Sequence, residues 1–392
     1  MNTPEQAHFG GLSGPQRDPY PWYRQMRQSA PVHYDPKDGC WNVFGYNDVQ
    51  RILLDHETFS SNLSGQMPVG NDDAIQTSII ALDPPRHNRL RSLVNKAFTR
   101  TSIGDLAPRI SAITAELLDK IVAAGQMDVV RDLAYPLPVT VIAEMLGVPP
   151  DDRERFKRWT DAIVGEPEAY REAPDAERQL GEYFVQIVDQ RRRQPRHDLI
   201  SALLQAEVDG ERLSMVELLG FCVLLLVAGN ETTTNLIGNA VLCFAENPDV
   251  PQRLRETPSL LPMTIEEVLR YRSPVQALPN RVATRDVEVA GQQIKRGQQV
   301  VFWLGSANRD EAKFPDAERF IMDRTPNPHL AFGAGVHFCL GAPLARLEAR
   351  IALAALLERC PNLEVDESGV VLGQSPIVFG PKRLPVRFGE SQ

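Results

Sequence analysis

Apolar side chains recur along most of the chain at spacings of three and four residues, the pattern of amphipathic helices. Together with capping signals, this pattern predicts a long series of helices. Their ranges are 20–29, 46–54, 85–97, 102–123, 136–146, 150–164, 175–193, 197–206, 214–246, 250–256, 262–271 and 342–359. Period-two alternation predicts a hairpin from 31–35 and 40–45, and further strands within 281–304. The chain is therefore predicted to be mainly α-helical with small β-sheets, an α+β fold.

The longest predicted helix, 214–246, begins with a clear signal. Ser214 and Glu217 have the spacing of a capping box ahead of an apolar run. Residues 218–229 are apolar on every face, which predicts a helix buried in the core. This apolar run is too short to span a bilayer, which requires roughly 20 residues.

The same helix then becomes polar, with the sequence AGNETTTN at 228–235. Burial disfavours such side chains unless they have partners. Gly229 would let a flat ligand approach the backbone, and the Thr232 hydroxyl can bond to the carbonyl of Ala228 and bend the helix. A polar notch against a bound group explains the stretch, and a solvated helix end is the alternative.

Composition and charge narrow the functional classes. The chain has 392 residues, of which 43% are hydrophobic and 24% charged, and a formal net charge of −9. Nucleic-acid binding requires a basic surface, so no nucleic acid is expected. No uninterrupted apolar run reaches the roughly 18 residues of a membrane span, and the N-terminus lacks the regions of a signal peptide. We therefore expect a cytoplasmic protein without a membrane span. Length by itself would allow two or three domains.

The five cysteines do not resemble a disulfide framework or a zinc site, because their number is odd and no C-x-x-C occurs. Cys222 and Cys243 lie in apolar helical segments and are predicted to be buried. Cys339 differs, because it lies in the glycine-rich stretch FGAGVHFCLG, residues 332–341. The glycines of this stretch are Gly333, Gly335 and Gly341.

Cys339 is placed just before the predicted helix 342–359. Backbone N–H groups at a helix start favour a thiolate over a thiol, and the glycines permit turns that direct N–H groups at sulfur. One thiolate without clustered ligands implies a metal that something else already holds, and a haem iron fits. The alternative is a nucleophilic cysteine, for which His337 is the base nearest in sequence.

Glu267 and Arg270 occur in the segment TIEEVLRYRSP, residues 264–274. Their spacing lets them pair on one face of a helix. Many surface helices carry such a pair, so a structural role is the default interpretation.

These segments together resemble the cytochrome P-450 superfamily. FGAGVHFCLG resembles its haem-binding signature, AGNET its oxygen-activating helix motif, and EEVLR its E-x-x-R motif. DPPRHNRLR, residues 83–91, resembles the segment that holds the haem propionates. SANRDEAKFPDAERF, residues 306–320, is similar to a stretch found in bacterial members. The order and spacing match from about residue 15 to residue 387.

The resemblance implies the cytochrome P-450 fold, with haem between a long central helix and a cysteine loop and helix. It also implies a single catalytic domain over residues 1–392 with no fused reductase. Cys339 is implied as the axial ligand of the iron. The residues implied to bind the haem propionates are His87, Arg91, Arg281 and His337. Glu231 and Thr232 match the acid–alcohol pair that relays protons, and Glu267 and Arg270 match a structural pair.

The implied function is a haem-thiolate monooxygenase that activates O2 to hydroxylate or epoxidise a hydrophobic small molecule. The implied cofactor is haem b, and a separate ferredoxin with its ferredoxin reductase would supply electrons. Outward cations of the basic segment 86–100, such as Arg89, Lys96 and Arg100, could meet an acidic partner, although a merely solvated face is an equal alternative.

The substrate is expected to be apolar, such as a terpenoid, steroid, fatty acid or macrolide. The residues expected to line its pocket are Ile80, Leu225, Ala228, Val275, Ala277, Leu278, Ile377 and Val378. Two other functions stay open, a peroxygenase that uses hydrogen peroxide and a haem sensor or carrier without turnover. Neither would need the acid–alcohol pair.

Overall fold

The structure is a computed structural model that describes residues 6–9, 12–15, 18–62, 78–164 and 175–389. The chain forms two compact units. The first unit contains Met1–Leu63, Thr114–Ala134 and Thr232–Gln392, and the second contains Ser64–Ile113 and Tyr135–Glu231. The loop-like segments 62–73 and 165–176 noted in the sequence lie almost entirely outside the described residues.

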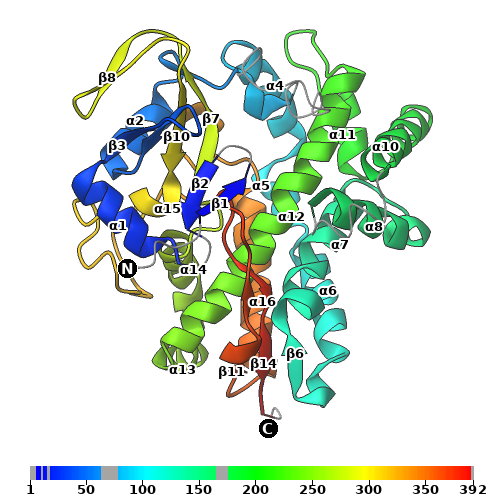
Figure 1. Ribbon diagram of the computed structural model, residues 1–392. Helices are drawn as coiled ribbons and strands as arrows, with labels where there is room; N and C mark the ends of the chain where they lie inside the picture. The colour runs from blue at the N-terminus through cyan, green and yellow to red at the C-terminus, as the bar shows by residue number, and fades with distance from the viewer. Residues whose placement is uncertain (1–5, 10–11, 16–17, 63–77, 165–174, 390–392) are drawn as a thin grey trace. The chain divides into compact units, whose positions relative to one another are not determined.

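The first unit holds a five-stranded sheet in the order β3-β4-β10-β7-β5. Figure 1 labels three of its strands, β3, β7 and β10. Its strands are β3 (Val32–Asp35), β4 (Cys40–Val43), β5 (Phe59–Ser60), β7 (Ala277–Ala283) and β10 (Gln299–Trp303). The predicted hairpin is confirmed as β3 and β4, which pair antiparallel. Strand β10 runs parallel to β4 and antiparallel to β7. The remaining strands form small sheets and are β1 (Gln6–Phe9), β2 (Leu12–Pro15), β6 (Gln126–Asp128), β8 (Val287–Val289), β9 (Gln292–Ile294), β11 (Glu364–Val365), β12 (Val371–Leu372), β13 (Pro381–Arg383) and β14 (Pro385–Arg387).

Strand β10 is buried on both faces, because successive side chains of a strand point to opposite sides. Val300 and Phe302 lie in one apolar cluster of the first unit, with Val43 and Ile52. The alternate residues of β10 lie in a second apolar cluster. Burial on both sides explains why β10 reads as a continuous apolar run rather than as an alternating one.

Helices make up the rest of the first unit. They are α1 (Tyr20–Ser29), α2 (Tyr46–Leu54), α13 (Asp249–Glu256), α14 (Leu261–Tyr271), α15 (Leu304–Ala307) and α16 (Ala342–Arg359), with the short turns η2 (Val122–Ala124), η3 (Val130–Ala134), η5 (Pro258–Leu260), η6 (Gly335–His337) and η7 (Glu367–Gly369). The structure confirms the predicted ranges of α1, α2 and α16 residue by residue.

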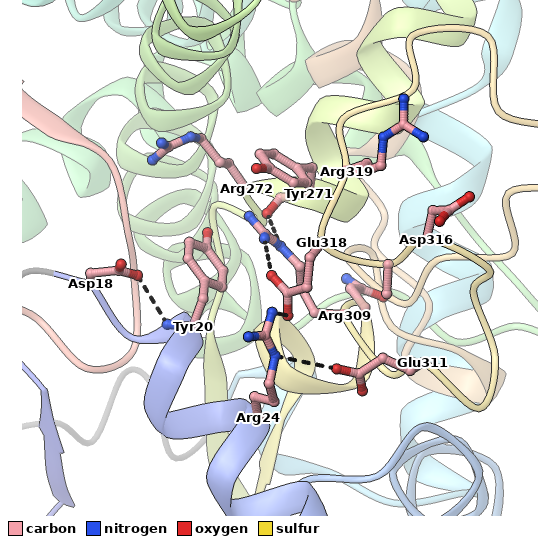
Figure 2. A network of polar contacts seen from close by, with 12 residues as sticks. Asp18, Tyr20, Arg24, Tyr271, Arg272, Arg309, Glu311, Asp316, Glu318 and Arg319 are labelled. Carbon is pink, nitrogen blue, oxygen red and sulfur yellow. Dashed lines mark hydrogen bonds and ion pairs between the residues drawn. The ribbon is translucent and has the colours of Figure 1, made fainter.

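Helix α1 is attached to its unit through a buried arginine between two aromatic rings (Figure 2). The Arg309 guanidinium carbon lies 3.8 Å from the ring centre of Tyr20 and 3.5 Å from that of Tyr271. Its Nη1 also donates to Glu318 at 2.8 Å. Arg24 on α1 reaches the same carboxylate at 3.1 Å. Because the side chain of Arg24 is 47% exposed, the stacked Arg309 contributes more to this attachment.

The second unit is helical. Its helices are α4 (Arg86–Ala97), α5 (Arg100–Gly104), α7 (Pro136–Met145), α8 (Arg153–Val164), α10 (Ala176–Arg193) and α11 (Leu199–Gln205), with the short turns η1 (Ile79–Ala81) and η4 (Pro150–Asp152). Helices α8 and α10 pack through aromatic pairs, with ring centres 6.2 Å apart for Phe156 and Phe184 and 5.3 Å apart for Trp159 and Tyr183. Two further helices belong partly to each unit, α6 (Ala107–Asp119) and α12 (Met215–Glu246).

The expected helix 102–123 is two helices, α5 and α6, followed by a short turn. Pro108 stands at the second position of α6, where a proline is tolerated because no intrahelical N–H is needed. A proline inside one continuous helix would instead break it. Thr99 caps α5 with a capping box that involves Ser102. Helix α5 therefore has an N-cap of its own.

Helix α12 confirms the predicted long central helix (Figure 1). The capping box is present, since Glu217 N donates to Ser214 Oγ at 3.3 Å and Ser214 N donates to Glu217 Oε2 at 2.9 Å. The helix continues through residues 228–235 to Glu246, so the solvated helix end considered for that stretch is wrong.

By length and composition α12 is the one helix, among the described residues, that could cross a membrane. The expectation that the chain has no membrane span was based on uninterrupted apolar runs. Helix α12 is longer than its apolar run and has 32 residues. Two of its polar side chains have hydrogen-bond partners inside the first unit. Asn239 Nδ2 donates to the carbonyls of Arg272 and Phe379 at 2.9 Å, and Thr234 Oγ1 donates to that of Ala134 at 3.1 Å. These contacts are those of a core helix.

Glu348 on α16 gives the fold a predicted pH dependence. The residue is 1% exposed, and within the described residues its Oε1 has no hydrogen-bond partner. Burial raises the pKa of Glu348 to about 8. The folded chain therefore keeps this carboxyl protonated at neutral pH, whereas the unfolded chain releases the proton above its ordinary pKa of 4.5. Stability is consequently lost as pH rises from 4.5 to about 8, by up to about 1.4 kcal/mol per pH unit.

Glu348→Gln, which is neutral at every pH, is expected to be more stable than the parent at pH 8 by a few kcal/mol. At pH 5 the difference should shrink to a fraction of that value. Urea unfolding at both pH values measures it, and Glu358→Gln on the exposed side of α16 is the matched control. A gain that is equal at both pH values would show that Glu348 is ionised in the folded chain.

Candidate functional site

The cysteine loop of the first unit is a series of tight turns that ends at helix α16. Cys339 N donates to the carbonyl of Phe332 at 2.9 Å, and Phe338 N donates to that of Gly335 at 3.1 Å. Gly333 and Gly335 both have φ +69°, a conformation that side-chain-bearing residues rarely adopt. A Cβ at Gly335 would also lie 2.8 Å from the carbonyl oxygen of Leu53. The glycines therefore shape this loop, as the sequence predicted.

Cys339 differs from the other cysteines in its exposure. It is partly exposed, whereas Cys40, Cys222, Cys243 and Cys360 are buried. Burial raises the pKa of the Cys222 and Cys243 thiols to about 12, so both remain protonated. The prediction that these two are buried apolar residues is confirmed. Cys339 thus lies just ahead of α16, three residues before the first helical residue.

Two of the expected propionate ligands lie in the same unit as Cys339. His337 precedes the cysteine by two residues, and its Nε2 lies 3.0 Å from Ser61 Oγ. Arg281 comes from β7, is 2% exposed, and donates from Nη1 to the carbonyl of Asn280 at 2.9 Å. Sequence reasoning did not identify Ser61, because nothing near residue 61 marks it as a partner of a residue so distant in the chain.

The other expected cofactor and proton-relay residues lie in or next to the second unit. His87 is 1% exposed on α4, and Arg91 follows one helical turn later. Glu231 is the last residue of the second unit and Thr232 the first of this part of the first unit, and both are half-buried on α12. The i,i+4 spacing of His87 and Arg91 places them on one face of their helix, as the sequence predicted.

Glu267 and Arg270 form a fully buried ion pair in α14. Both side chains are 0% exposed, and Nε and Nη2 of Arg270 each donate to the carboxylate at 2.8 Å. Arg270 also donates to the carbonyls of Asn308, Ala317 and Arg319 at 2.8–3.0 Å. Burial lowers the pKa of Arg270, and its contacts with Glu267 oppose that effect.

Two apolar segments that were expected to line a pocket lie side by side in the first unit. Val275 forms an antiparallel bridge with Val378, and Gln276 N donates to the carbonyl of Ile377 at 2.7 Å. Leu278 and Ile377 are half-buried, which leaves part of each accessible. Ala277 is different, because it is 0% exposed inside the apolar cluster that contains Trp303 and Phe379. Its assignment to the pocket lining is therefore wrong.

The second unit holds the remaining expected pocket residues. Ile80 is 38% exposed, whereas its neighbour Ile79 packs with Leu90 and Leu93. On α12, Leu225 is half-buried and Ala228 is exposed. Gly229 has a packing role that the sequence did not show, because a Cβ there would lie 2.9 Å from Cδ1 of Ile142 on α7.

The donor set fits a metal that enters the protein inside an organic ligand. Among the described residues, no three His, Cys, Asp or Glu side chains converge as a metal site. A single cysteine thiolate can complete the coordination of an iron already held by four other ligands, but it cannot hold a bare ion. Haem has this property and brings two carboxylates for cationic partners.

Comparison with known proteins decides the family. The family model for cytochrome P-450 matches residues 156–257 and 259–386. The chain is 47% identical over 382 residues to cytochrome P-450 109 of Bacillus spizizenii, covering 94% of this chain and 92% of the relative. The chain belongs to the cytochrome P-450 family. It is a monooxygenase of that family, and haem iron binding is characteristic of the family.

Two further relatives bear on the chemistry of this cytochrome P-450. The crystal structure of CYP109E1 from Bacillus megaterium in complex with testosterone has a TM-score of 0.88 at 46% identity, covering 95% of this chain and 99% of that one. The mycinamicin IV hydroxylase/epoxidase of Micromonospora griseorubida is 40% identical over 375 residues, covering 93% and 94% of the two chains. The similarity to the solved structure confirms the fold expected from the sequence.

Sequence reasoning missed a second polar cluster beside the cysteine loop of this cytochrome P-450. Arg346 on α16 donates to both oxygens of Glu266 at 2.7 and 2.8 Å, and its guanidinium lies 4.4 Å from the ring centre of Phe332. Burial would raise the pKa of Glu266, but bonds from Arg346 and His329 outweigh it and hold the pKa at about 2. The cluster thus ties α14 to the loop and to α16.

Two cations of the basic segment around α4 have hydrogen-bond acceptors within the chain. Arg89 Nη1 donates to Glu211 at 3.1 Å, and Lys96 Nζ donates to the carbonyl of Glu207. The side chain of Arg100 lies outside the described residues. The chain itself therefore supplies acceptors for two of the three cations considered for an acidic partner.

Proposed function

We propose that this cytochrome P-450 hydroxylates or epoxidises an apolar substrate of steroid or macrolide size. The observation that carries the proposal is the similarity, over nearly the whole chain, to an enzyme crystallised with testosterone and to the mycinamicin IV hydroxylase/epoxidase. The adjacent segments at 275–278 and 377–378 support it, because their partly accessible side chains are apolar. Apolar pockets with few polar anchors bind apolar ligands of this size.

In this proposal the cofactor is haem b, with Cys339 as the axial ligand. His337 and Arg281 in the first unit and His87 and Arg91 in the second would bind the propionates, because buried carboxylates need cationic or hydrogen-bonding partners. When bound, haem supplies the reductive activation of O2 and the transfer of one oxygen atom. A separate ferredoxin with its reductase would supply the electrons.

The residues of α12 would supply protons. In this role Thr232 would pass its hydroxyl proton to the oxygen substrate, and Glu231 would return a proton to that hydroxyl through water. Half-burial of both side chains limits the access of bulk water, which keeps the transfer directional. The two are adjacent on one helix, so the backbone fixes their relative position.

Turnover with a surrogate ferredoxin system and a panel of steroids and macrolides tests the proposal. Oxygenated product from at least one apolar compound, formed with O2 and reductant, is the expected result. Product that forms with hydrogen peroxide but never with the electron-transfer system would favour the peroxygenase alternative. Ligand-induced changes of the haem spectrum without any product would favour a sensor.

Thr232→Ala is expected to bind haem and substrate as the parent does but to uncouple the reaction. Because positioned proton donors contribute about a hundredfold or more, product per electron should fall about tenfold or further while hydrogen peroxide accumulates. Thr233→Ala is the control, since its side chain points about 100° away around the helix and is 3% exposed. Added peroxide should partly rescue Thr232→Ala. Unchanged coupling would show that the proton route does not use Thr232.

A further inference from the structure

The second unit contains a basic cleft that the oxygenation chemistry does not use. Its volume is about 500 Å³, and it is bounded by α6, the end of α7, the start of α8 and the segment between α10 and α11. The charged residues that line it are Arg109, Arg153, Arg191, Arg196, Glu144 and Asp198. Among the described residues that line the cleft, four guanidinium groups accompany two carboxylates, a formal excess of two positive charges in a chain whose net charge is −9.

The ion pairs within the cleft show which arginines carry the excess positive charge. Glu144 serves two arginines, because Arg109 chelates it with two bonds of 2.9 Å and Arg153 Nη2 contacts it at 2.9 Å. Within the described part of the chain, Arg153 Nε is buried without a hydrogen-bond acceptor. The Arg196 side chain forms no ion pair with any described residue, although its backbone N–H donates to Ser201. Arg196 thus has donors to offer a ligand, and the side chain of Arg153 is 33% exposed.

The floor of the cleft is rigid. Arg191, whose side chain is 2% exposed, pairs with Asp198 and donates from Nη2 to the carbonyl of Gly147 at 2.8 Å. Asp198 in turn accepts from Ser201 N at 2.8 Å and caps α11. Gly147 has φ +74°, and a Cβ there would lie 2.8 Å from Arg191 Nη2. A site built on such a floor loses little freedom when a ligand binds.

We propose that this cleft binds a small phosphorylated metabolite that carries at least two negative charges. An arginine guanidinium can donate two parallel hydrogen bonds to two oxygens of one phosphate group. A phosphate group also offers acceptors to several guanidinium groups at once. The excess of two positive charges calls for a dianion rather than a single carboxylate. A volume of about 500 Å³ is that of a small-molecule site rather than of an extended docking surface. The ligand would touch Arg153, Arg196 and the neighbouring His197, which also lines the cleft.

Calorimetric titration of the haem-loaded enzyme with inorganic pyrophosphate tests the proposal, at about 0.1 M ionic strength so that weak surface binding is screened. Saturable binding with one ligand per chain and a Kd of about 1 mM or below is expected. Arg196→Gln should weaken it about tenfold, and Arg153→Gln/Arg196→Gln should weaken it further. Pyrophosphate should also raise the Tm of the parent but not that of the double variant.

Arg193→Gln is the matched control, since this arginine ends α10 next to the cleft without lining it. Its pyrophosphate affinity should equal that of the parent. Because Arg196 is exposed and in no ion pair with the described residues, Arg196→Gln retains the fold and its result stands even if the double variant unfolds. Absence of saturable binding to the parent, an equal loss in Arg193→Gln, or binding only to vesicles of anionic phospholipid would each overturn the proposal.

Discussion

Cys339→Ser is expected to abolish both monooxygenase activity and the thiolate signature of the haem. In the parent, the reduced carbon monoxide complex should show the strongly red-shifted Soret band of thiolate ligation. A serine hydroxyl is a far weaker donor than a thiolate and does not supply the electron density that thiolate ligation provides. The variant should therefore lose the band, and product formation should fall below detection.

The fold around the substituted position is expected to persist, because the loop is shaped by backbone bonds and by Gly333 and Gly335 rather than by the thiol. Cys222→Ala is the matched control, since that thiol is buried on α12 and its pKa is about 12. It should keep the red-shifted band. A parent spectrum like that of a histidine-ligated globin would remove the haem-thiolate assignment altogether.

Sequence periodicity predicted the helices well because their apolar faces are long enough to be counted. The capping box of Ser214 and Glu217 and the bounds of α16 are local features, and the structure has both. The break between α5 and α6 was missed, although Pro108 was a visible signal for it. Strands of two or three residues, such as β12 and β13, are too short to show alternation.

Long-range pairing was the main part of the fold that the sequence did not reveal. The parallel pairing of β10 with β4 joins Gln299 to Cys40, and no local pattern predicts it. The same limit explains the error at Ala277. Its segment is apolar and adjacent to Ile377, but only the structure shows that this residue packs in the core cluster.

The parts of the candidate site that can be predicted from the sequence are those whose residues lie close together in the chain. Cys339 with its glycines, and Glu267 with Arg270, lie within ten residues of each other in their own segments, so their spacing carries information. Ser61 and Arg346 were missed because each acts on a residue distant in sequence, His337 and Glu266 respectively. A buried serine or an arginine on a helix has no sequence mark that distinguishes it from many others.

Arg270→Ala is expected to yield little soluble, haem-loaded protein. The substitution leaves the Glu267 carboxylate without its main partner in a fully buried position, and it removes the donor to three backbone carbonyls. Removing one partner of a buried ion pair typically costs about 3–5 kcal/mol. Since a folded domain of ordinary stability has only about 5–15 kcal/mol in total, this loss takes a large share of it.

The remaining bonds to Glu267 do not compensate for that loss. Ile321 N donates to Oε1 at 2.9 Å and Arg324 Nε reaches both oxygens at 3.1–3.2 Å, but neither occupies the space that the guanidinium of Arg270 fills. Arg253→Ala on α13 is the control, because its pair with Asp323 is 44% and 47% exposed and should be worth less than about 1 kcal/mol. Urea unfolding and the haem content of purified protein measure both variants. An Arg270→Ala protein with parental haem content and an unfolding midpoint equal to that of Arg253→Ala would show that this buried pair does not stabilise the fold.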